Sequence, residues 1–139
     1  NWKGAFFTIQ KALTLMREGG SIQLISSCAN LKGLPAFSVY SGTKAAVRSL
    51  ARCLAAELAP KGIRVNCLSP GCIETPVWTR SGVPADQVDG VKEFMTTMIP
   101  MERFGEPDEV ASVALFLASE ESSYVTGANI AADGGFAQV

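Results

Sequence analysis

Short apolar runs alternate with longer amphipathic segments, and this alternation restricts the fold more than any other feature of the sequence. The expected elements are, in chain order, a helix ending at Gly19-Gly20, a strand at 22–25, a helix from Tyr40 to Ala59, a strand at 63–69, a helix beginning at 106–109 and a strand at 128–132. Helices that alternate with apolar strands form a parallel sheet covered by helices. The predicted fold class is therefore α/β, with strand 22–25 buried on both faces.

The expected helix from Tyr40 to Ala59 carries more than one apolar face. Its larger apolar residues form a single stripe, made of Val47, Leu50, Leu54 and Leu58. Alanines at 45, 46, 51, 55, 56 and 59 would let neighbours approach closely on other sides as well. We expect this helix to lie between its own sheet and a partner subunit.

Composition bounds the class of protein. The chain has 139 residues, of which 47% are hydrophobic and 18% charged, as in one globular domain. Twelve basic and thirteen acidic residues give a net charge of -1 and leave no cationic stripe for nucleic acid. No apolar run reaches the roughly 18 residues that a bilayer requires, and the first residues lack the layout of a secretory signal. We expect a soluble cytoplasmic protein with no nucleic-acid or membrane partner.

The chain contains no histidine, which excludes Ser-His-Asp and Cys-His catalysis by this sequence alone. Any general acid must be another residue type. The cysteines Cys28, Cys53, Cys67 and Cys72 show no Cys-x-x-Cys spacing, so mixed zinc sites are not expected. We expect four free thiols, mostly buried, and no metal.

Residues 76–100 differ from the rest, because prolines at 76, 84 and 100 divide the segment. Its apolar residues could line one side of a short helix: Val88, Val91, Phe94, Met95 and Met98. Two interpretations stay open at this stage. The segment is either a substrate lid, for which methionine-rich surfaces are suited, or a surface helix with an apolar underside.

Tyr40 and Lys44 are four residues apart at the start of a helix, so their side chains project from one face. An ordinary tyrosine is a poor acid at neutral pH, but a nearby ammonium stabilises the phenolate. Such Tyr-x-x-x-Lys pairs also occur on solvated helices, so the pair alone is weak evidence for a catalytic site. Here Ser27 ends a buried strand shortly before Tyr40, and ligands bind at strand ends in open α/β sheets. Ser27 could donate a hydrogen bond to a substrate oxygen.

A series of motifs runs through the whole chain in order: Gly20–Ser27, Tyr40–Lys44, Asn66–Gly71, Thr126-Gly127 and Asp133–Gly135. In residues and spacing the chain resembles the carboxyl-terminal half of a short-chain dehydrogenase/reductase. The resemblance implies the carboxyl-terminal half of a doubly wound, Rossmann-type parallel sheet with flanking helices. Residues 1–139 would be one part of a single domain, with a catalytic segment at 21–44 and a substrate-binding lid at 76–100. The dinucleotide-binding amino-terminal half would be absent from this chain.

The resemblance also implies the site residues. The family's catalytic tetrad falls on Asn1, Ser27, Tyr40 and Lys44, where Tyr40 transfers the proton, Ser27 orients the carbonyl oxygen, Lys44 assists the phenol and Asn1 supports a linking water. The cofactor, NAD or NADP, would be bound by Tyr40, Lys44, Pro70, Gly71, Ile73 and Thr75. The Pro70-Gly71 turn is expected to expose backbone amides. No metal is implied.

The implied activity is hydride transfer between a nicotinamide cofactor and a small-molecule carbonyl or secondary alcohol, of the 3-oxoacyl-carrier reductase or sugar and alcohol dehydrogenase kind. A homo-oligomer, tetramer or dimer, is expected by the same resemblance. One alternative is a non-catalytic relative that serves oligomer assembly or binding through its alanine-rich helix. Another, a serine hydrolase that uses Ser27, lacks a histidine base. Thr14 and Gly42 depart from the residues commonest in the family, and neither is a proton-transfer group.

Overall fold

The sheet has three parallel strands. The computed structural model describes residues 1–80 and 82–139, and its strands are β1 (Ser21–Ile25), β2 (Arg64–Pro70) and β3 (Asn129–Ala132), in the order β1-β2-β3. Leu24 of β1 pairs with Cys67 of β2, and Leu68 of β2 pairs with Ile130 of β3. The predicted parallel α/β architecture is confirmed.

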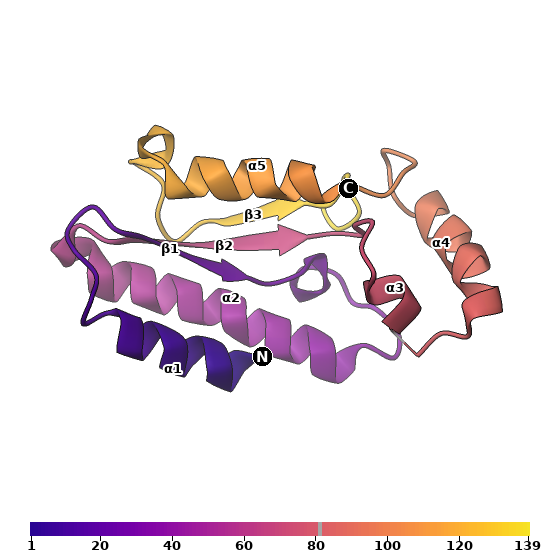
Figure 1. The fold of residues 1–139 in the computed structure, drawn as a ribbon, viewed down its shortest axis with the longest axis horizontal. Helices are drawn as coiled ribbons and strands as arrows, with labels where there is room; N and C mark the ends of the chain where they lie inside the picture. Colours follow the sequence, from indigo (N-terminus) through magenta and orange to yellow (C-terminus); the bar gives the residue numbers. More distant parts are fainter. Residues whose placement is uncertain (81) are drawn as a thin grey trace.

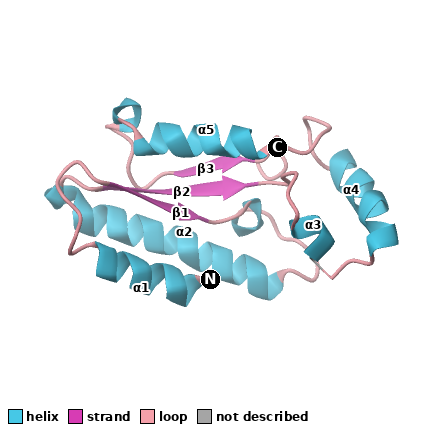
Figure 2. Ribbon diagram, viewed as in Figure 1, coloured by secondary structure: helices cyan, strands magenta, loops and turns pink. Residues whose placement is uncertain are grey.

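Helices cover both faces of this sheet. The α-helices are α1 (Trp2–Ala12), α2 (Ser38–Leu58), α3 (Val77–Arg80), α4 (Val88–Thr97) and α5 (Pro107–Ala118), and the short 3-10 turns are η1 (Cys28–Asn30), η2 (Ala59–Lys61), η3 (Ala85–Gln87) and η4 (Glu120–Ser122). α1 and α2 lie on one face and α5 lies on the other (Figure 1). α3 and α4 lie beyond the carboxyl ends of the strands (Figure 2). Residue 81 of the expected lid lies outside the described residues.

The main core lies between α2 and the sheet. Val47, Leu54 and Leu58 are buried there and Leu50 is partly buried, which confirms the predicted stripe. Ala51 is also completely buried, because a small side chain lets α2 pack closely against the sheet. The same cluster contains Leu24, Ala55, Ile63, Val65 and Cys67.

α5 is attached to the sheet by polar side chains as well as by packing. The Ser21 hydroxyl donates to the Leu117 carbonyl at 2.8 Å, and the Gln23 amide donates to the Ala114 carbonyl at 2.7 Å. The Arg64 guanidinium donates to the Leu117 carbonyl at 2.9 Å and to the Ser122 hydroxyl at 2.7 Å. The bonds from Ser21 and Arg64 satisfy the Leu117 carbonyl, which lies in the last turn of α5 and has no intrahelical donor.

Two expectations about the first elements are wrong. α1 ends at Ala12 and does not reach Gly19-Gly20, since Leu15 and Met16 donate their amides three residues back in tight turns. β1 is not buried on both faces, because Ile25 is 51% exposed. β1 is the edge strand of the described sheet, so its outer side has no neighbouring strand there.

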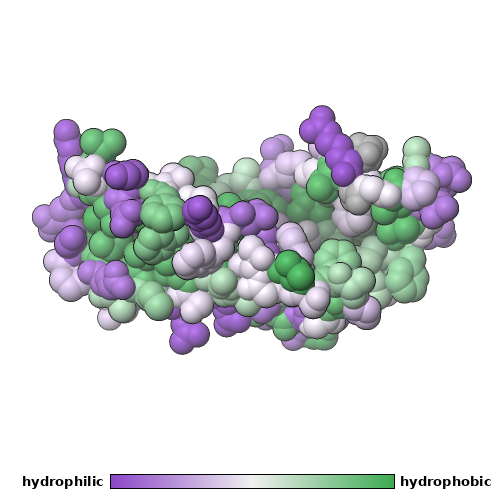
Figure 3. Space-filling model, turned by 90° about the horizontal axis from the view of Figure 1, so that it is seen from below, coloured by the Kyte–Doolittle hydropathy of each residue, from purple (hydrophilic) through white to green (hydrophobic). Residues whose placement is uncertain are grey.

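The surface formed by α1 and α2 carries apolar areas between polar ones (Figure 3). Trp2 and Phe7 of α1 are 42% and 48% exposed, and Val39 of α2 is 83% exposed. A partner subunit on this side stays a prediction. None of the helices in the described part of the chain is long and apolar enough to cross a bilayer.

The amino terminus of α5 is closed by a capping box. The Glu106 carbonyl accepts from the Glu109 amide at 3.0 Å, and the Glu109 carboxylate accepts from the Glu106 amide at 2.7 Å. The Arg103 guanidinium binds the same carboxylate through two nitrogens, at 2.6 and 2.8 Å. The bonds from Arg103 and from the Glu106 amide lower the pKa of Glu109 from 4.5 to about 2.

We predict that this carboxylate makes stability depend on pH at the acid end. Because the folded pKa is depressed, the contribution is complete above the unfolded pKa of 4.5 and disappears as pH falls toward about 2. Glu109→Gln should therefore unfold earlier in urea than the unmodified protein at pH 6, and this difference should vanish between pH 4.5 and about 2. As a control, Glu121→Gln changes an exposed carboxylate of η4 that forms no ion pair among the described residues. A constant difference across this pH range would contradict the assignment.

Candidate active site

Ser27 is the second residue after β1 and the N-cap of η1. Its hydroxyl oxygen accepts from the Ala29 amide at 3.2 Å and thereby caps this short turn. Among the described residues, the remaining contact of the hydroxyl is the Cys28 sulfur, 3.9 Å away. The oxygen is held in place, while the hydroxyl hydrogen has no strong acceptor.

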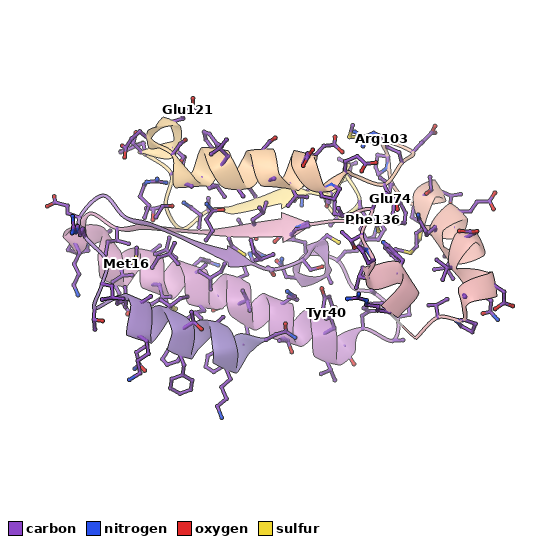
Figure 4. The ribbon with its side chains drawn as sticks, viewed as in Figure 1. Met16, Tyr40, Glu74, Arg103, Glu121 and Phe136 are labelled. Carbon is purple, nitrogen blue, oxygen red and sulfur yellow. The ribbon has the colours of Figure 1, made fainter. Side chains whose placement is uncertain are left out.

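Tyr40 and Lys44 lie in the first turns of α2. The Lys44 ammonium is 5.7 Å from the centroid of the Tyr40 ring and donates to the Ile25 carbonyl at 3.1 Å. Tyr40 is 42% exposed and contacts Phe37 edge to face. Figure 4 shows Tyr40 near the start of α2, below the turn that follows β1. Both side chains are therefore on the helix face that lies next to the end of β1, as their spacing predicts.

Lys44 is a half-buried ammonium, and burial lowers its pKa. Its single hydrogen-bond acceptor among the described residues is the Ile25 carbonyl, although an ammonium has three donors. Lys44 also lines a cavity of about 240 Å³ together with Asn1, Thr8 and Gln23. A half-buried cation with unoccupied donors beside a cavity can bind a hydroxylated ligand.

Asn1 precedes α1 and shares this cavity with Lys44. Its side chain makes no capping bond to α1, although asparagine is a preferred capping residue. The structure therefore brings the first and last members of the predicted tetrad to one cavity. Ser27 and Tyr40 do not line it.

The predicted cofactor segment follows β2. Ser26 donates its amide to the Leu68 carbonyl at 2.8 Å, so the end of β1 and the end of β2 lie side by side. Gly71 donates to the Ala132 carbonyl, and Glu74 to the Gly105 carbonyl, both at 2.9 Å. Both amides are thus occupied within the chain, and for Gly71 this differs from the exposed amide expected of the Pro70-Gly71 turn.

The chain is folded tightly at Gly71. A β-carbon at this position would lie 2.6 Å from Asp133 Cα, so only glycine fits without a shift. Further along, the Ile73 carbonyl accepts from the Trp78 indole at 2.8 Å, and the Thr75 carbonyl accepts from the Trp78 amide at 3.4 Å. Ile73 and Thr75 are thereby joined to α3.

The segment at 76–100 packs on a second apolar cluster beyond the strand ends. Met95 of α4 and Met98, which caps its carboxyl end, contact this cluster, which contains Cys28, Cys72, Ile99, Phe104 and Phe136. The Lys92 ammonium pairs with Glu74 at 2.6 Å, so α4 is joined to the loop after β2 (Figure 4). Phe94 differs from the predicted stripe, because it is 63% exposed. The apolar underside is present, and a lid function stays a prediction.

Sequence reasoning missed a set of polar groups behind Ser27. The Ser26 hydroxyl donates to the Lys44 carbonyl at 2.9 Å, and the Asn30 amide contacts Ser26 and Ser69. The serine pair at 26–27 was a visible signal, but only its second member was singled out. No motif marks Asn30.

The thiols are unpaired, as predicted, and three of the four are buried. Burial raises the pKa of Cys72 to about 11, so this thiol is protonated at neutral pH. Within residues 1–80 and 82–139, no three Cys, Asp or Glu side chains are placed to hold a metal ion.

The chain matches known proteins over nearly its full length. The family model described as enoyl-(acyl carrier protein) reductase matches residues 1–137. The chain belongs to the short-chain dehydrogenase/reductase family. It is 45% identical to "Oxidoreductase asL5" of Sarocladium schorii over 100% of this chain and 55% of that protein. It is 43% identical to the 3-oxoacyl-[acyl-carrier-protein] reductase FabG of Thermotoga maritima over 97% of this chain and 53% of the relative.

Solved structures of the short-chain dehydrogenase/reductase family show the same fold. The crystal structure of the angucycline C-6 ketoreductase LanV with bound NADP superposes with a TM-score of 0.88 at 31% identity, over 99% of this chain and 51% of that chain. The chain thus spans about half the length of the curated relatives it matches. It corresponds to part of a Rossmann-type sheet, as the motifs predicted.

Asn66 is a family motif residue with a structural role in this chain. It is fully buried in β2, where its amide donates to the Val125 carbonyl at 2.8 Å and its oxygen accepts from the Ala128 amide at 3.0 Å. Asn66 therefore joins β2 to the loop before β3.

Proposed function

We propose that the protein carrying this chain is an oxidoreductase that transfers hydride between NAD or NADP and a small-molecule carbonyl or secondary alcohol. The observation that carries the proposal is the placement of the Lys44 ammonium, 5.7 Å from the Tyr40 ring and 3.1 Å from the Ile25 carbonyl at the end of β1. This arrangement places an acid-base group, the Tyr40 phenol, next to the strand end at which open α/β sheets bind their ligands.

In the proposed reduction, Tyr40 donates its phenolic proton to the carbonyl oxygen of the substrate. The Ser27 hydroxyl, whose hydrogen has no strong acceptor, donates a hydrogen bond to the same oxygen. Lys44 stabilises the phenolate that remains. Asn1, beside the same cavity as Lys44, supports a water that returns a proton to the site.

The bound nicotinamide supplies the hydride. Lys44 would hold the ribose, and Pro70, Gly71, Ile73 and Thr75 would form the wall of the cofactor site next to β2. Two observations support this: Lys44 has unused donors, and a structural relative of this chain was solved with NADP. Tyr40 would contact both cofactor and substrate.

We propose that residues 76–100 cover a substrate with an uncharged, apolar portion. The apolar side of α4 supports this, because Met95 and Met98 already pack at the carboxyl ends of the strands. Relatives that bear names such as FabG and ketoreductase support a ketone as the reacting group. The domain would be completed by a dinucleotide-binding half and assembled as a cytoplasmic homo-oligomer.

A cofactor-fluorescence screen tests the proposed activity. The full-length protein is mixed with NADH or NADPH and a panel of carbonyls: acetoacetyl thioester, ethyl acetoacetate, an aldohexose and an aromatic polycyclic ketone. We expect at least one carbonyl to be reduced with one of the two cofactors. Cofactor binding without consumption on the whole panel, in both reaction directions, would favour the non-catalytic alternative.

A further inference from the structure

The Asn30 side chain joins the segments that carry the predicted catalytic residues. Asn30 lies at the end of η1, and its amide nitrogen is within hydrogen-bond distance of three oxygens. These are the Ser27 carbonyl, the Ser26 hydroxyl at 3.1 Å and the Ser69 hydroxyl at 2.8 Å. Its oxygen faces the Arg48 guanidinium of α2 at 3.4 Å.

The chemistry of these partners fixes the orientation of the amide. A guanidinium has only donors and a backbone carbonyl only accepts, so the oxygen must face Arg48 and the nitrogen must face Ser27. With the amide reversed, two acceptors would meet at Ser27 and two donors at Arg48. Asn30 is therefore held in one orientation.

Each of the two serine hydroxyls donates its hydrogen to another residue and accepts from Asn30. The Ser26 hydroxyl donates its hydrogen to the Lys44 carbonyl at 2.9 Å, so toward Asn30 it can only accept. The Ser69 hydroxyl donates to the Asn129 side chain at 2.6 Å and likewise accepts from Asn30. Ser26 and Ser69 are 3% and 0% exposed, so water cannot replace a lost partner without rearrangement.

We propose that Asn30 is a positioning residue that fixes Ser27 and Lys44 relative to each other. One route is direct, through the Ser27 carbonyl, and the other passes through the Ser26 hydroxyl to the Lys44 carbonyl. Lys44 is then held at both ends, because its ammonium also donates to Ile25. This inference rests on the proposed function, since it assigns a role within the same site.

The substitution Asn30→Asp tests the inference at constant side-chain size. A carboxylate keeps the acceptor for Arg48 but loses both N–H groups and places an oxygen against the Ser27 carbonyl. Ser26 and Ser69 would turn to donate to the carboxylate and release Lys44 and Asn129. Asn129→Ala is the matched control, because it removes the far partner of Ser69 and leaves the bonds to Ser27 and Lys44 in place.

The measurements use the full-length protein, NADPH or NADH, and the carbonyl that the unmodified protein reduces best. We expect Asn30→Asp to lower kcat about 10- to 100-fold while KM changes less than about threefold, since misplacement of reacting groups reduces the rate of the chemical step. The pH of half-maximal alcohol oxidation should rise, because a displaced ammonium stabilises the phenolate less. Asn129→Ala should keep the kcat and the pH profile of the unmodified protein. An unchanged kcat and pH profile in Asn30→Asp, or the same losses in Asn129→Ala, would overturn the proposal.

Two further measurements keep the inference separate from the proposed function. If the unmodified protein reduces no carbonyl, the proposed function fails. Crystal structures of both variants then still test the positioning role. Unchanged positions of Ser27 and Lys44 in Asn30→Asp would refute it. If Asn30→Asp does not fold, Ser26→Ala removes the route to the Lys44 carbonyl and leaves the bond from Asn30 to the Ser27 carbonyl. We then expect a lower kcat and a shifted pH profile, and an unchanged profile would refute the role.

Discussion

Replacing Tyr40 with phenylalanine should nearly abolish carbonyl reduction and leave the fold intact. The variant keeps the aromatic ring, which contacts Phe37 and lies 5.7 Å from the Lys44 ammonium, and removes only the hydroxyl. Loss of a positioned general acid lowers rates by about 10²- to 10⁴-fold. Because Tyr40 is 42% exposed, loss of the hydroxyl should not change the thermal unfolding midpoint. Initial rates and thermal unfolding of the full-length protein measure both effects.

The chain provides a matched control for this substitution. Tyr124 is the second of its two tyrosines and is fully exposed, at 102%. Tyr124→Phe should retain the activity of the unmodified protein. Retained turnover in Tyr40→Phe, or equal losses in both variants, would show that the phenol is not the proton donor.

Replacing Gly71 with alanine should destabilise the fold. The added β-carbon would lie 2.6 Å from Cα and 2.7 Å from Cβ of Asp133, which belongs to a buried turn. Asp133 cannot move freely, because its carboxylate accepts the amides of Gly135 and Ala137 at 3.0 and 2.9 Å. Such overpacking costs about 1 to 3 kcal/mol. Urea unfolding should show a midpoint lowered accordingly.

Gly90→Ala is the control for Gly71→Ala. Gly90 lies inside α4, and no atom lies within 4 Å of the position of an added β-carbon. Alanine is favoured over glycine in helices by up to about 1 kcal/mol, so this variant should be as stable as the unmodified protein or more so. If Gly71→Ala unfolds at the unmodified midpoint, the turn is looser than the structure shows.

Local sequence patterns predicted the helices and strands well, and predicted less well which of their side chains are buried. The stripe of α2 was predictable because Val47, Leu54 and Leu58 recur at helical spacing and all face one sheet. The exposure of Ile25 was not, because burial of a strand's side chains depends on which distant elements cover that part of each face of the sheet. The early end of α1 was also missed, since the turns at Leu15 and Met16 have no strong sequence signal.

The candidate site divides in the same way. Tyr40 and Lys44 were predictable because one helix fixes their separation, and Ser27 because a strand ends there. Asn30 was not predictable, because its partners come from three segments, at 26–27, 48 and 69, that only the folded chain brings together. A residue whose function depends on distant partners leaves no local pattern.

Deuterium transfer tests the central claim most directly. The full-length protein is incubated with NADPH or NADH deuterated at the transferable position and with the carbonyl panel, and the alcohol products are analysed by mass spectrometry. We predict one deuterium on the carbinol carbon of at least one product, and none above background with Tyr40→Phe. Unlabelled products, or equal label from the Tyr40→Phe variant, would contradict hydride transfer assisted by this phenol.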